Sequence, residues 1–455
     1  MIFLTSKILS WEKASSFIFK LQKRLFKSVY VHDLQKIFSI QKLILNSNSA
    51  RLLAIREVTQ ISYIKKIAGV DGKTSLTFLE RFELNENLKF NFQNWFPQSL
   101  KKVDFVSKEE ITVELKISTI SDRAWQALIK LAIEPAHEAI FSPCFFGFRL
   151  SRSIYEVQNS FFLNLSADSF GLQKRILKLN LNKSLSFYNY NYLVDKIISP
   201  RSIKLGIFRS LKKGIILSYL QEERLTKYEF CNLLYNVFFD GLEQFGNCIR
   251  FSNTVIFFLK PFDNEKKLTE TIKKFLYDLG LSSLDFNFDI ISVLKGFDFL
   301  YWNFKLAKNG DFLCTPSLQY YKIFLKRVKR IINNSNYGSE IKVSKLSPII
   351  REWYLYNKFS NLKGVRFSLF YIKKRCFRLF NKESKQDFYS SKRLVDNCFL
   401  NSNTFYNENF EDKIFSSPYF GHFIFWNKYH FVKLHKDVLI NNYYCIHCGM
   451  NFSLY

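Results

Sequence analysis

The sequence predicts an α+β fold, with a domain of mixed strands and helices followed by a mainly helical one. Hydrophobic residues make up 47% of the 455 residues, enough for the cores of about two to four domains. Between Pro135 and about Asn303, short apolar runs of strand length alternate with stretches of helical spacing. Beyond Ser317 helical spacing alone remains, which predicts a helical region.

Residues 1–70 predict amphipathic basic helices. Leu34, Ile37 and Phe38 fall on one helical face, and cations such as Arg24 fall on others. Between Thr74 and Leu115 this periodicity fades and polar residues dominate, so we expect a loop or an insertion there.

The next helix is predicted from its cap and its apolar face. Ser121 can cap a helix that carries Trp125, Leu128 and Ala132 on one side, and Pro135 predicts that this helix ends before the proline.

Three helices are predicted beyond Ser317. Ser347 and Pro348 predict the start of one of them, with Trp353 on its buried face. In the other two, apolar residues line one face, whereas the opposite face holds Lys322 and Lys326 in the first and Lys374, Arg375 and Arg378 in the second. Basic faces on successive helices indicate a groove that neutralises a phosphate backbone, rather than cations that contact only solvent.

The charge balance indicates a polyanionic partner. Lys and Arg number 67 against 39 Asp and Glu, a net charge of +28. A merely solvated basic surface is the alternative. No apolar run approaches the roughly 18 residues of a membrane span, so we expect no membrane partner, and no pattern indicates a small-molecule substrate.

Composition also bears on the compartment. The eight cysteines are scattered except for Cys445 and Cys448, which favours a reducing compartment over a disulfide framework. Neither a secretory signal nor an organellar transit peptide is recognisable. The 51 Phe residues, with heavy use of Lys, Asn and Ile, are typical of AT-rich organellar coding. We expect an organelle-encoded protein of the plastid (chloroplast stroma).

Two motifs follow each other along the chain. The first runs from Ser121-Asp122-Arg123-Ala124-Trp125-Gln126 through Glu134-Pro135-Ala136-His137-Glu138, and the second is Gly147-Phe148-Arg149-Leu150-Ser151-Arg152-Ser153. Their order, spacing and residue types resemble the fingers region of group II intron reverse transcriptases and maturases. The resemblance implies that Arg149 and Arg152 contact backbone phosphates, for which planar bidentate donors are suited.

The similarity covers most of the chain and implies a right-hand polymerase architecture. Residues 21–72 resemble the family's amino-terminal element, residues 296–300 the strand pair that closes the palm, and residues 346–356 the opening of the thumb-like domain X. The implied regions are an amino-terminal RNA-binding extension with the start of the fingers (1–115), a degenerate fingers and palm (116–305), a helical thumb or domain X (306–400), and a remnant of a zinc-finger nuclease module (401–455).

The chain departs from the family at the catalytic acids. In the family, one aspartate ends a palm strand, two more occupy a hairpin turn, and together they hold two magnesium ions. Here those positions are Asn180, Asn253 and Thr254. An amide or a hydroxyl brings no charge to Mg²⁺, which prefers carboxylate and phosphate oxygens. We therefore expect a catalytically inactive reverse transcriptase homologue.

The carboxyl-terminal Cys445-Ile446-His447-Cys448-Gly449 resembles the first half of the family's nuclease module. The module's second cysteine pair and paired histidines are not found, so nuclease activity is not expected. His430 and His435 would complete a four-ligand zinc site with Cys445 and Cys448, because nitrogen and sulfur ligands suit tetrahedral zinc. The alternatives are an unoccupied remnant or two ordinary thiols, and no other cofactor is expected.

The resemblance thus implies a maturase, of the degenerate plastid-encoded type of euglenoid algae, that binds structured intron RNA in precursor transcripts and assists splicing. An active RNA-dependent DNA polymerase and a general basic RNA-binding protein remain the alternatives. The residues expected to contact RNA are Arg24, Arg56, Arg149, Arg152, Lys322, Lys326, Arg351, Lys374, Arg375 and Arg378.

Overall fold

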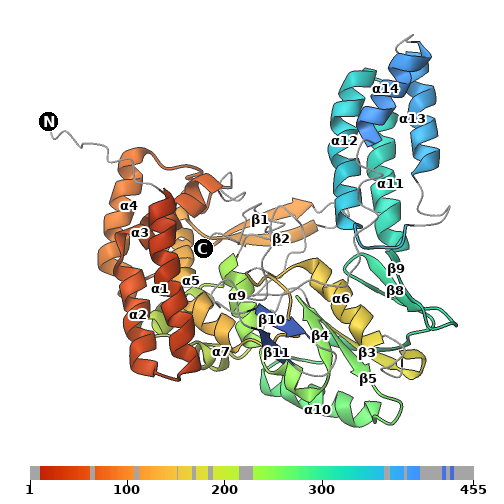
Figure 1. Cartoon of the computed structure of the whole chain (residues 1–455). Helices are drawn as coiled ribbons and strands as arrows, with labels where there is room; N and C mark the ends of the chain where they lie inside the picture. The colour runs from red at the N-terminus through yellow and green to blue at the C-terminus, as the bar shows by residue number, and fades with distance from the viewer. Residues whose placement is uncertain are drawn as a thin grey trace.

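The computed structural model describes residues 11–61, 67–106, 112–150, 152–165, 171–182, 188–214, 229–362, 369–383 and 387–399, with the backbone of two short strands at 423–426 and 431–434. Helices and strands are mixed through most of these residues, which confirms the predicted α+β class. Figure 1 shows amino-terminal helices on one side, a sheet in the middle and a separate bundle of helices beyond it.

The amino-terminal layer consists of α1 (Trp11–Tyr30), α2 (Leu34–Asn46) and α3 (Asn48–Arg56), the last continued by one π turn (Glu57–Ile61). Asp33 caps α2 and Ser47 caps α3, because each side chain accepts a free backbone N–H of the first turn. The apolar faces of all three helices lie in one buried cluster with helix α5 (Ile120–Ile140). The predicted amphipathic helices are confirmed here.

The described residues of 74–115 have regular secondary structure, contrary to the expected loop. They form α4 (Phe78–Asn91), a 3₁₀ turn (Phe92–Asn94) and an antiparallel hairpin of β1 (Lys101–Val106) and β2 (Thr112–Ile117). The apolar periodicity of α4 is weak because Phe78, Phe82 and Phe90 are exposed while only Leu84, Asn85 and Leu88 are buried. The overlooked signal was the capping box of Thr77 and Glu80, in which each side chain binds the other's backbone N–H.

Helix α5 differs from its prediction at both ends. Thr119, rather than Ser121, caps it, and it continues through Pro135 to Ile140. Proline lacks an N–H, so it cannot bond the carbonyl of Leu131 one turn earlier. The amide of Gln22 on α1 donates to that carbonyl at 2.9 Å. A partner that is distant in sequence thus satisfies the carbonyl that the proline leaves free.

The central sheet is antiparallel, with strand order β4-β5-β3-β6. On β3 the residues Leu177, Leu179 and Leu181 face the core shared with α5, whereas Ile176 faces a second core. The sheet and its surrounding helices comprise β3 (Arg175–Leu181), β4 (Cys248–Phe251), β5 (Thr254–Leu259), β6 (Phe286–Ser292), α6 (Ile154–Leu165), α7 (Tyr190–Lys196), α8 (Arg201–Lys212), α9 (Glu229–Phe238) and α10 (Glu265–Asp278).

A three-stranded sheet links this body to the helical bundle. It consists of β7 (Phe297–Phe299), β8 (Trp302–Leu306) and β9 (Phe312–Pro316). The indole of Trp302 donates to Asn357 Oδ1 at 3.1 Å and stacks on Tyr356 at 4.7 Å between ring centroids. These buried contacts join the sheet to the end of α12 (Ser339–Tyr356).

The bundle contains α11 (Leu318–Ile332), α12, α13 (Phe370–Glu383) and α14 (Phe388–Phe399) around one apolar cluster. Ser317 caps α11, at the boundary that the sequence predicts. Pro348 lies inside α12, which begins at Ser339, so the predicted helix start at Ser347 was wrong. Trp353 is buried and stacks on Phe324 at 4.4 Å between ring centroids.

Strands β10 (Phe423–Trp426) and β11 (Phe431–Leu434) pair antiparallel. Among the helices that the structure describes, none is both long and apolar enough to span a membrane.

Candidate functional site

The structure brings together the three residues predicted at the lost catalytic positions. Asn180 on β3 lies opposite Thr254 on β5, and the threonine hydroxyl donates to the Asn180 side-chain carbonyl at 3.5 Å. Asn253 precedes Thr254 and donates from its amide to the carbonyl of Leu181 at 2.9 Å. The hydrogen bonds join β3 to the hairpin of β4 and β5, so the three side chains share one end of the sheet.

A tight turn places Asn253 there. Ser252 and Asn253 alone connect β4 to β5, and Ser252 has a φ of 62°, in the left-handed region. A Cβ on Gly147 would lie 2.5 Å from the Ser252 nitrogen, far inside the contact distance. Glycine at position 147 therefore lets the Gly-Phe-Arg motif pass directly against the hairpin turn.

The charge near Asn180 comes from β6. The Asn180 amide donates to the carboxylate of Asp289 at 3.1 Å, across the β3–β6 ladder. Among the described residues, no group of three or more His, Cys, Asp or Glu side chains is arranged to hold a metal ion. The site offers amides, a hydroxyl and one exposed carboxylate to a ligand.

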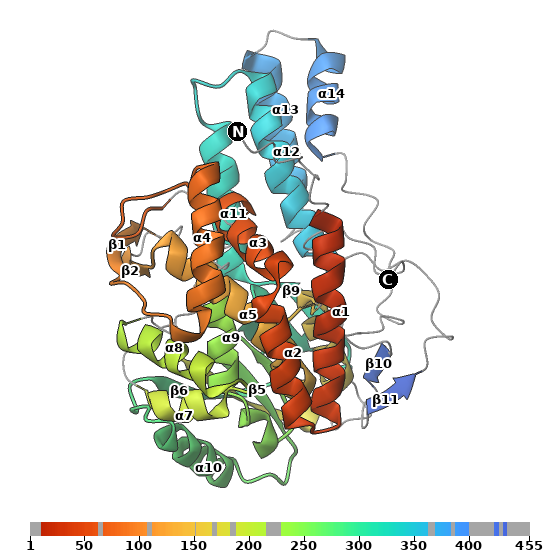
Figure 2. The same cartoon turned by 90° about the vertical axis from the view of Figure 1, so that its left-hand side faces the viewer.

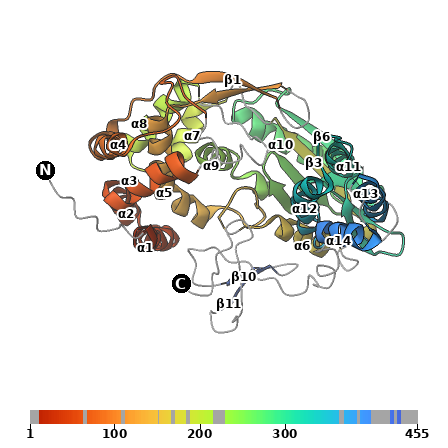
Figure 3. The same ribbon diagram turned by 90° about the horizontal axis from the view of Figure 1, so that it is seen from above.

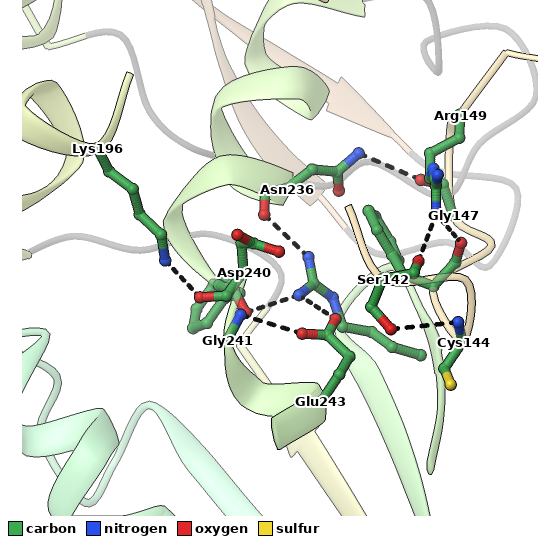
Figure 4. A network of polar contacts seen from close by, with 12 residues as sticks. Ser142, Cys144, Gly147, Arg149, Lys196, Asn236, Asp240, Gly241 and Glu243 are labelled. Carbon is green, nitrogen blue, oxygen red and sulfur yellow. Dashed lines mark hydrogen bonds and ion pairs between the residues drawn. The ribbon is translucent and has the colours of Figure 1, made fainter. Parts of the chain in front are cut away.

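Arg149 has a different environment from the expected phosphate contact. It is 9% exposed, and its guanidinium donates to both carboxylate oxygens of Glu138, at 2.9 and 2.8 Å. Its Nη1 atom donates to the carbonyls of Ser142 and Phe145. Figure 4 shows Arg149 turned toward Ser142. The expectation of a phosphate contact is corrected, because this arginine is buried and its donors fix the 142–149 loop to α5.

Arg152 is also turned inward. Its Nη1 atom donates to Glu156 at 3.0 Å, and its side chain is 10% exposed. The motif alone did not indicate this, because a Gly-Phe-Arg sequence is also found in ordinary turns with a surface arginine. The acid one helical turn later was the available signal for Arg152.

A third buried arginine was missed by the sequence reasoning. Arg250 on β4 is 0% exposed, donates to Glu243 at 2.7 Å and to the carbonyls of Phe239 and Asn236, and lies 4.0 Å from the ring of Phe145. Figure 4 shows Glu243 and Asn236 within this network. An arginine in the apolar run of β4 was the available signal, since a charge is fully buried only when it is paired.

Asp240 lies at the edge of the same network. Burial raises the pKa of its carboxyl, the charge of Glu243 raises it further, and Lys196 and Arg250 lower it. Lys196 donates to the backbone carbonyl of Asp240 (Figure 4). The network joins α7, α9 and β4 to one another, so these ionic groups serve the fold.

The predicted cations of the helical bundle are exposed. Lys322 and Lys326 lie on the outer face of α11, and Arg351 lies on that of α12. On α13 the exposed cations are Lys374, Arg375 and Arg378, while Cys376 and Phe380 are fully buried. Helix α11 contains no acidic residue. The predicted helix registers of α11 and α13 are therefore confirmed.

Two predicted cations belong to the amino-terminal layer. Arg24 is exposed on α1 and, with Lys27 and Lys36, lines a concavity of about 420 Å³ between α1 and α2. Arg56 is partly buried, and its guanidinium lies 4.4 Å from the ring of Trp11.

The proposed zinc ligands Cys445, Cys448, His430 and His435 lie outside the described residues.

Comparisons with known proteins agree along the chain. Residues 7–88 match the family model described as the N-terminal domain of reverse transcriptase. "Maturase-like protein 1" of Euglena gracilis is 51% identical over 445 residues, which cover 97% of this chain and 96% of that protein. "Maturase-like protein 1" of Euglena longa is 46% identical over 450 residues, 98% of this chain and 97% of its own.

Proposed function

The chain belongs to the family of the Euglena maturase-like proteins, which are related to reverse transcriptases, and on that premise we propose that it binds structured intron RNA and assists splicing. The proposed architecture is a right hand, with fingers and palm at 116–305 and a thumb at 306–400 that corresponds to domain X. The amino-terminal extension at 1–115 contributes further RNA contacts, and 401–455 is a remnant of a nuclease module.

The observation that carries the proposal is that positions 180, 253 and 254, at one end of the central sheet, hold no carboxylate. Asn180, Asn253 and Thr254 lie side by side where a polymerase of this architecture needs carboxylates to hold two magnesium ions. A protein that keeps the scaffold without these acids can hold RNA but cannot direct metal ions onto a growing strand. The splicing chemistry then belongs to the RNA.

RNA binding is supported by the distribution of charge. The exposed faces of α11, α12 and α13 present Lys322, Lys326, Arg351, Lys374 and Arg378 without competing acids on α11. Such faces bind the phosphate backbone of A-form RNA by charge and shape. Exposed aromatics on α13 and α14, such as Tyr371 at 65% and Tyr389 at 77%, add surfaces on which bases can stack.

We predict that replacing Lys374, Arg375 and Arg378 together by Ala weakens binding to the host intron. The slope of log affinity against log salt should fall by roughly two, since each of the three lost phosphate contacts contributes about 0.7. Fluorescence anisotropy across a salt series measures both quantities.

The matched control replaces Lys266, Lys267 and Lys274 on α10 by Ala. These lysines are equally exposed, but α10 also carries Glu265, Glu270 and Asp278, and it lies at the opposite end of the molecule from the bundle (Figure 1). Equal losses in both variants would contradict a specific role for α13. Competition with unrelated RNA of equal length separates intron recognition from general RNA binding.

We also propose a zinc site formed by Cys445 and Cys448 with His430 and His435, because two thiolates and two imidazoles match tetrahedral zinc. Metal analysis of the purified protein should find about one zinc ion per chain. Cys448→Ser should lose that zinc, and zinc that survives this substitution would remove the proposal.

The proposed compartment is the plastid, with the protein encoded in the organelle. The amino-acid usage, including 51 Phe residues, is typical of AT-rich organellar coding and supports this proposal. Detection of the protein in isolated plastids rather than in the surrounding cytosol would test it.

A further inference from the structure

A second basic surface lies apart from the helical bundle. It is formed by α8 and by residues 92–103, which run from the 3₁₀ turn into β1. Neither residues 92–103 nor residues 201–214 contain an acid. Together they hold seven cations: Lys101, Lys102, Arg201, Lys204, Arg209, Lys212 and Lys213. Cations without interspersed acids give this surface a strongly positive potential.

The two segments are joined by hydrogen bonds. The guanidinium of Arg209 on α8 donates to Asn94 Oδ1 at 2.7 Å and to the carbonyl of Trp95 at 3.3 Å. At the end of α8, a Cβ on Gly214 would lie 3.7 Å from Lys116 Nζ on β2. Figures 2 and 3 show α8 beside α4 and below the base of the β1–β2 hairpin. The carboxyl-terminal half of α8, with Arg209, Lys212 and Lys213, therefore lies beside residues 94–100 and the base of the hairpin.

An exposed aromatic ring lies beside Arg209 on this surface. Phe96 is 66% exposed, although the guanidinium of Arg209 lies only 4.0 Å from its ring. Arg209 is itself held by Asn94 and Trp95, so the ring and the guanidinium form a fixed pair. A phenyl ring left this exposed contributes little to the core. Its π surface, polarised by the cation, is suited to stacking against a planar base.

We propose that the surface formed by Phe96, Arg209, Lys101, Lys212 and Lys213 binds an unpaired segment of RNA. One base stacks on the Phe96–Arg209 pair, and the neighbouring phosphates lie against the lysines. Paired bases keep their faces inside the helix, whereas bases in loops and bulges expose them for stacking. The surface would recognise unpaired nucleotides beside the helices held by the thumb, so it rests on the proposed RNA-binding function.

The test compares two probes, a single-stranded oligouridine of about 12 nucleotides and an RNA duplex of similar length, by fluorescence anisotropy over a salt series. Phe96→Leu should weaken oligouridine binding by roughly 5- to 150-fold, the range that corresponds to loss of one stacked base. Its salt slope should not change, because stacking releases no counterions. Duplex affinity should change by less than about twofold, since the duplex offers no free base face.

A second variant, Lys212→Ala with Lys213→Ala, should lower the oligouridine salt slope by about 1.4, the sum expected for two single-strand phosphate contacts. The matched control is Phe78→Leu. That ring is 81% exposed on α4, whose exposed side also carries Glu83. Phe78→Leu should leave binding to both probes unchanged.

The possible results distinguish failure of this inference from failure of the proposed RNA-binding function. If Phe96→Leu and the double lysine variant bind oligouridine as the unaltered protein does, the surface only fastens residues 92–103 to α8, and the inference fails while intron binding through α13 stands. Equal losses for oligouridine and duplex would also contradict stacking. Failure of the unaltered protein to bind any RNA would overturn both the inference and the proposed function.

Discussion

Primer extension by the purified protein on a primed RNA template, with Mg²⁺ and labelled nucleotides, is expected to stay at the level of a reaction without protein. Two-metal catalysis requires carboxylates that position both ions and offset their charge. Here the Asn253 amide donates to the carbonyl of Leu181, and the Thr254 hydroxyl donates to the side chain of Asn180. These groups bring no charge to a metal ion. The expected effect is a loss of the whole catalysed reaction rather than a lowered rate.

Asp289 provides the sharpest control, because its carboxylate accepts the Asn180 amide at 3.1 Å. Robust extension that Asp289→Asn abolishes would show that a metal site survives on β6, and the inactive-polymerase proposal would fail. Restoring aspartate at positions 180, 253 and 254 together is not expected to restore activity. The family that the chain resembles has a Pro-Gln-Gly signature in its nucleotide pocket, and the sequence between Gly214 and Asn236 lacks it.

Arg250→Met is expected to lower the free energy of unfolding by about 3–5 kcal/mol, the range for removing one partner of a buried ion pair. Arg250 is fully buried, and its loss leaves the Glu243 carboxylate, which is 4% exposed, without its cation. Urea denaturation followed by circular dichroism measures the change. The double variant Arg250→Met with Glu243→Leu should recover part of the loss, because no unpaired charge is left buried.

Lys266→Met on the exposed face of α10 is the matched control and should change the unfolding free energy by less than about 0.5 kcal/mol. A loss of similar size in both variants would contradict the assignment of Arg250 as a buried structural cation.

The sequence predicted those parts of the fold whose signal is local. On α13, apolar residues recur at helical spacing, so the exposure of Lys374 and the burial of Cys376 could be read directly. Partners far along the chain set the rest. The Gln22 amide satisfies the carbonyl that Pro135 leaves free in α5. No local sequence pattern predicts a donor more than 100 residues away.

In the candidate site, too, some residues could be placed from the local sequence and others could not. Alternating apolar residues placed Asn180 on a strand and Asn253 at a turn, and the sheet register brought them together. The burial of Arg149 could not be predicted, because it depends on how the 142–149 loop folds back on Glu138. A basic residue in a motif reveals its charge, but the tertiary fold decides whether that charge reaches solvent.

Assistance to splicing is tested most directly by measuring spliced and unspliced transcripts in cells with and without the protein. We predict that particular introns stay unspliced in its absence while unrelated transcripts mature normally, because an RNA-folding helper acts only where its binding site exists. Re-expression of the unaltered protein should restore splicing, and the Lys374, Arg375 and Arg378 triple Ala variant should restore it poorly. Normal splicing of every intron in the absence of the protein would contradict the maturase function and favour a general RNA-binding role.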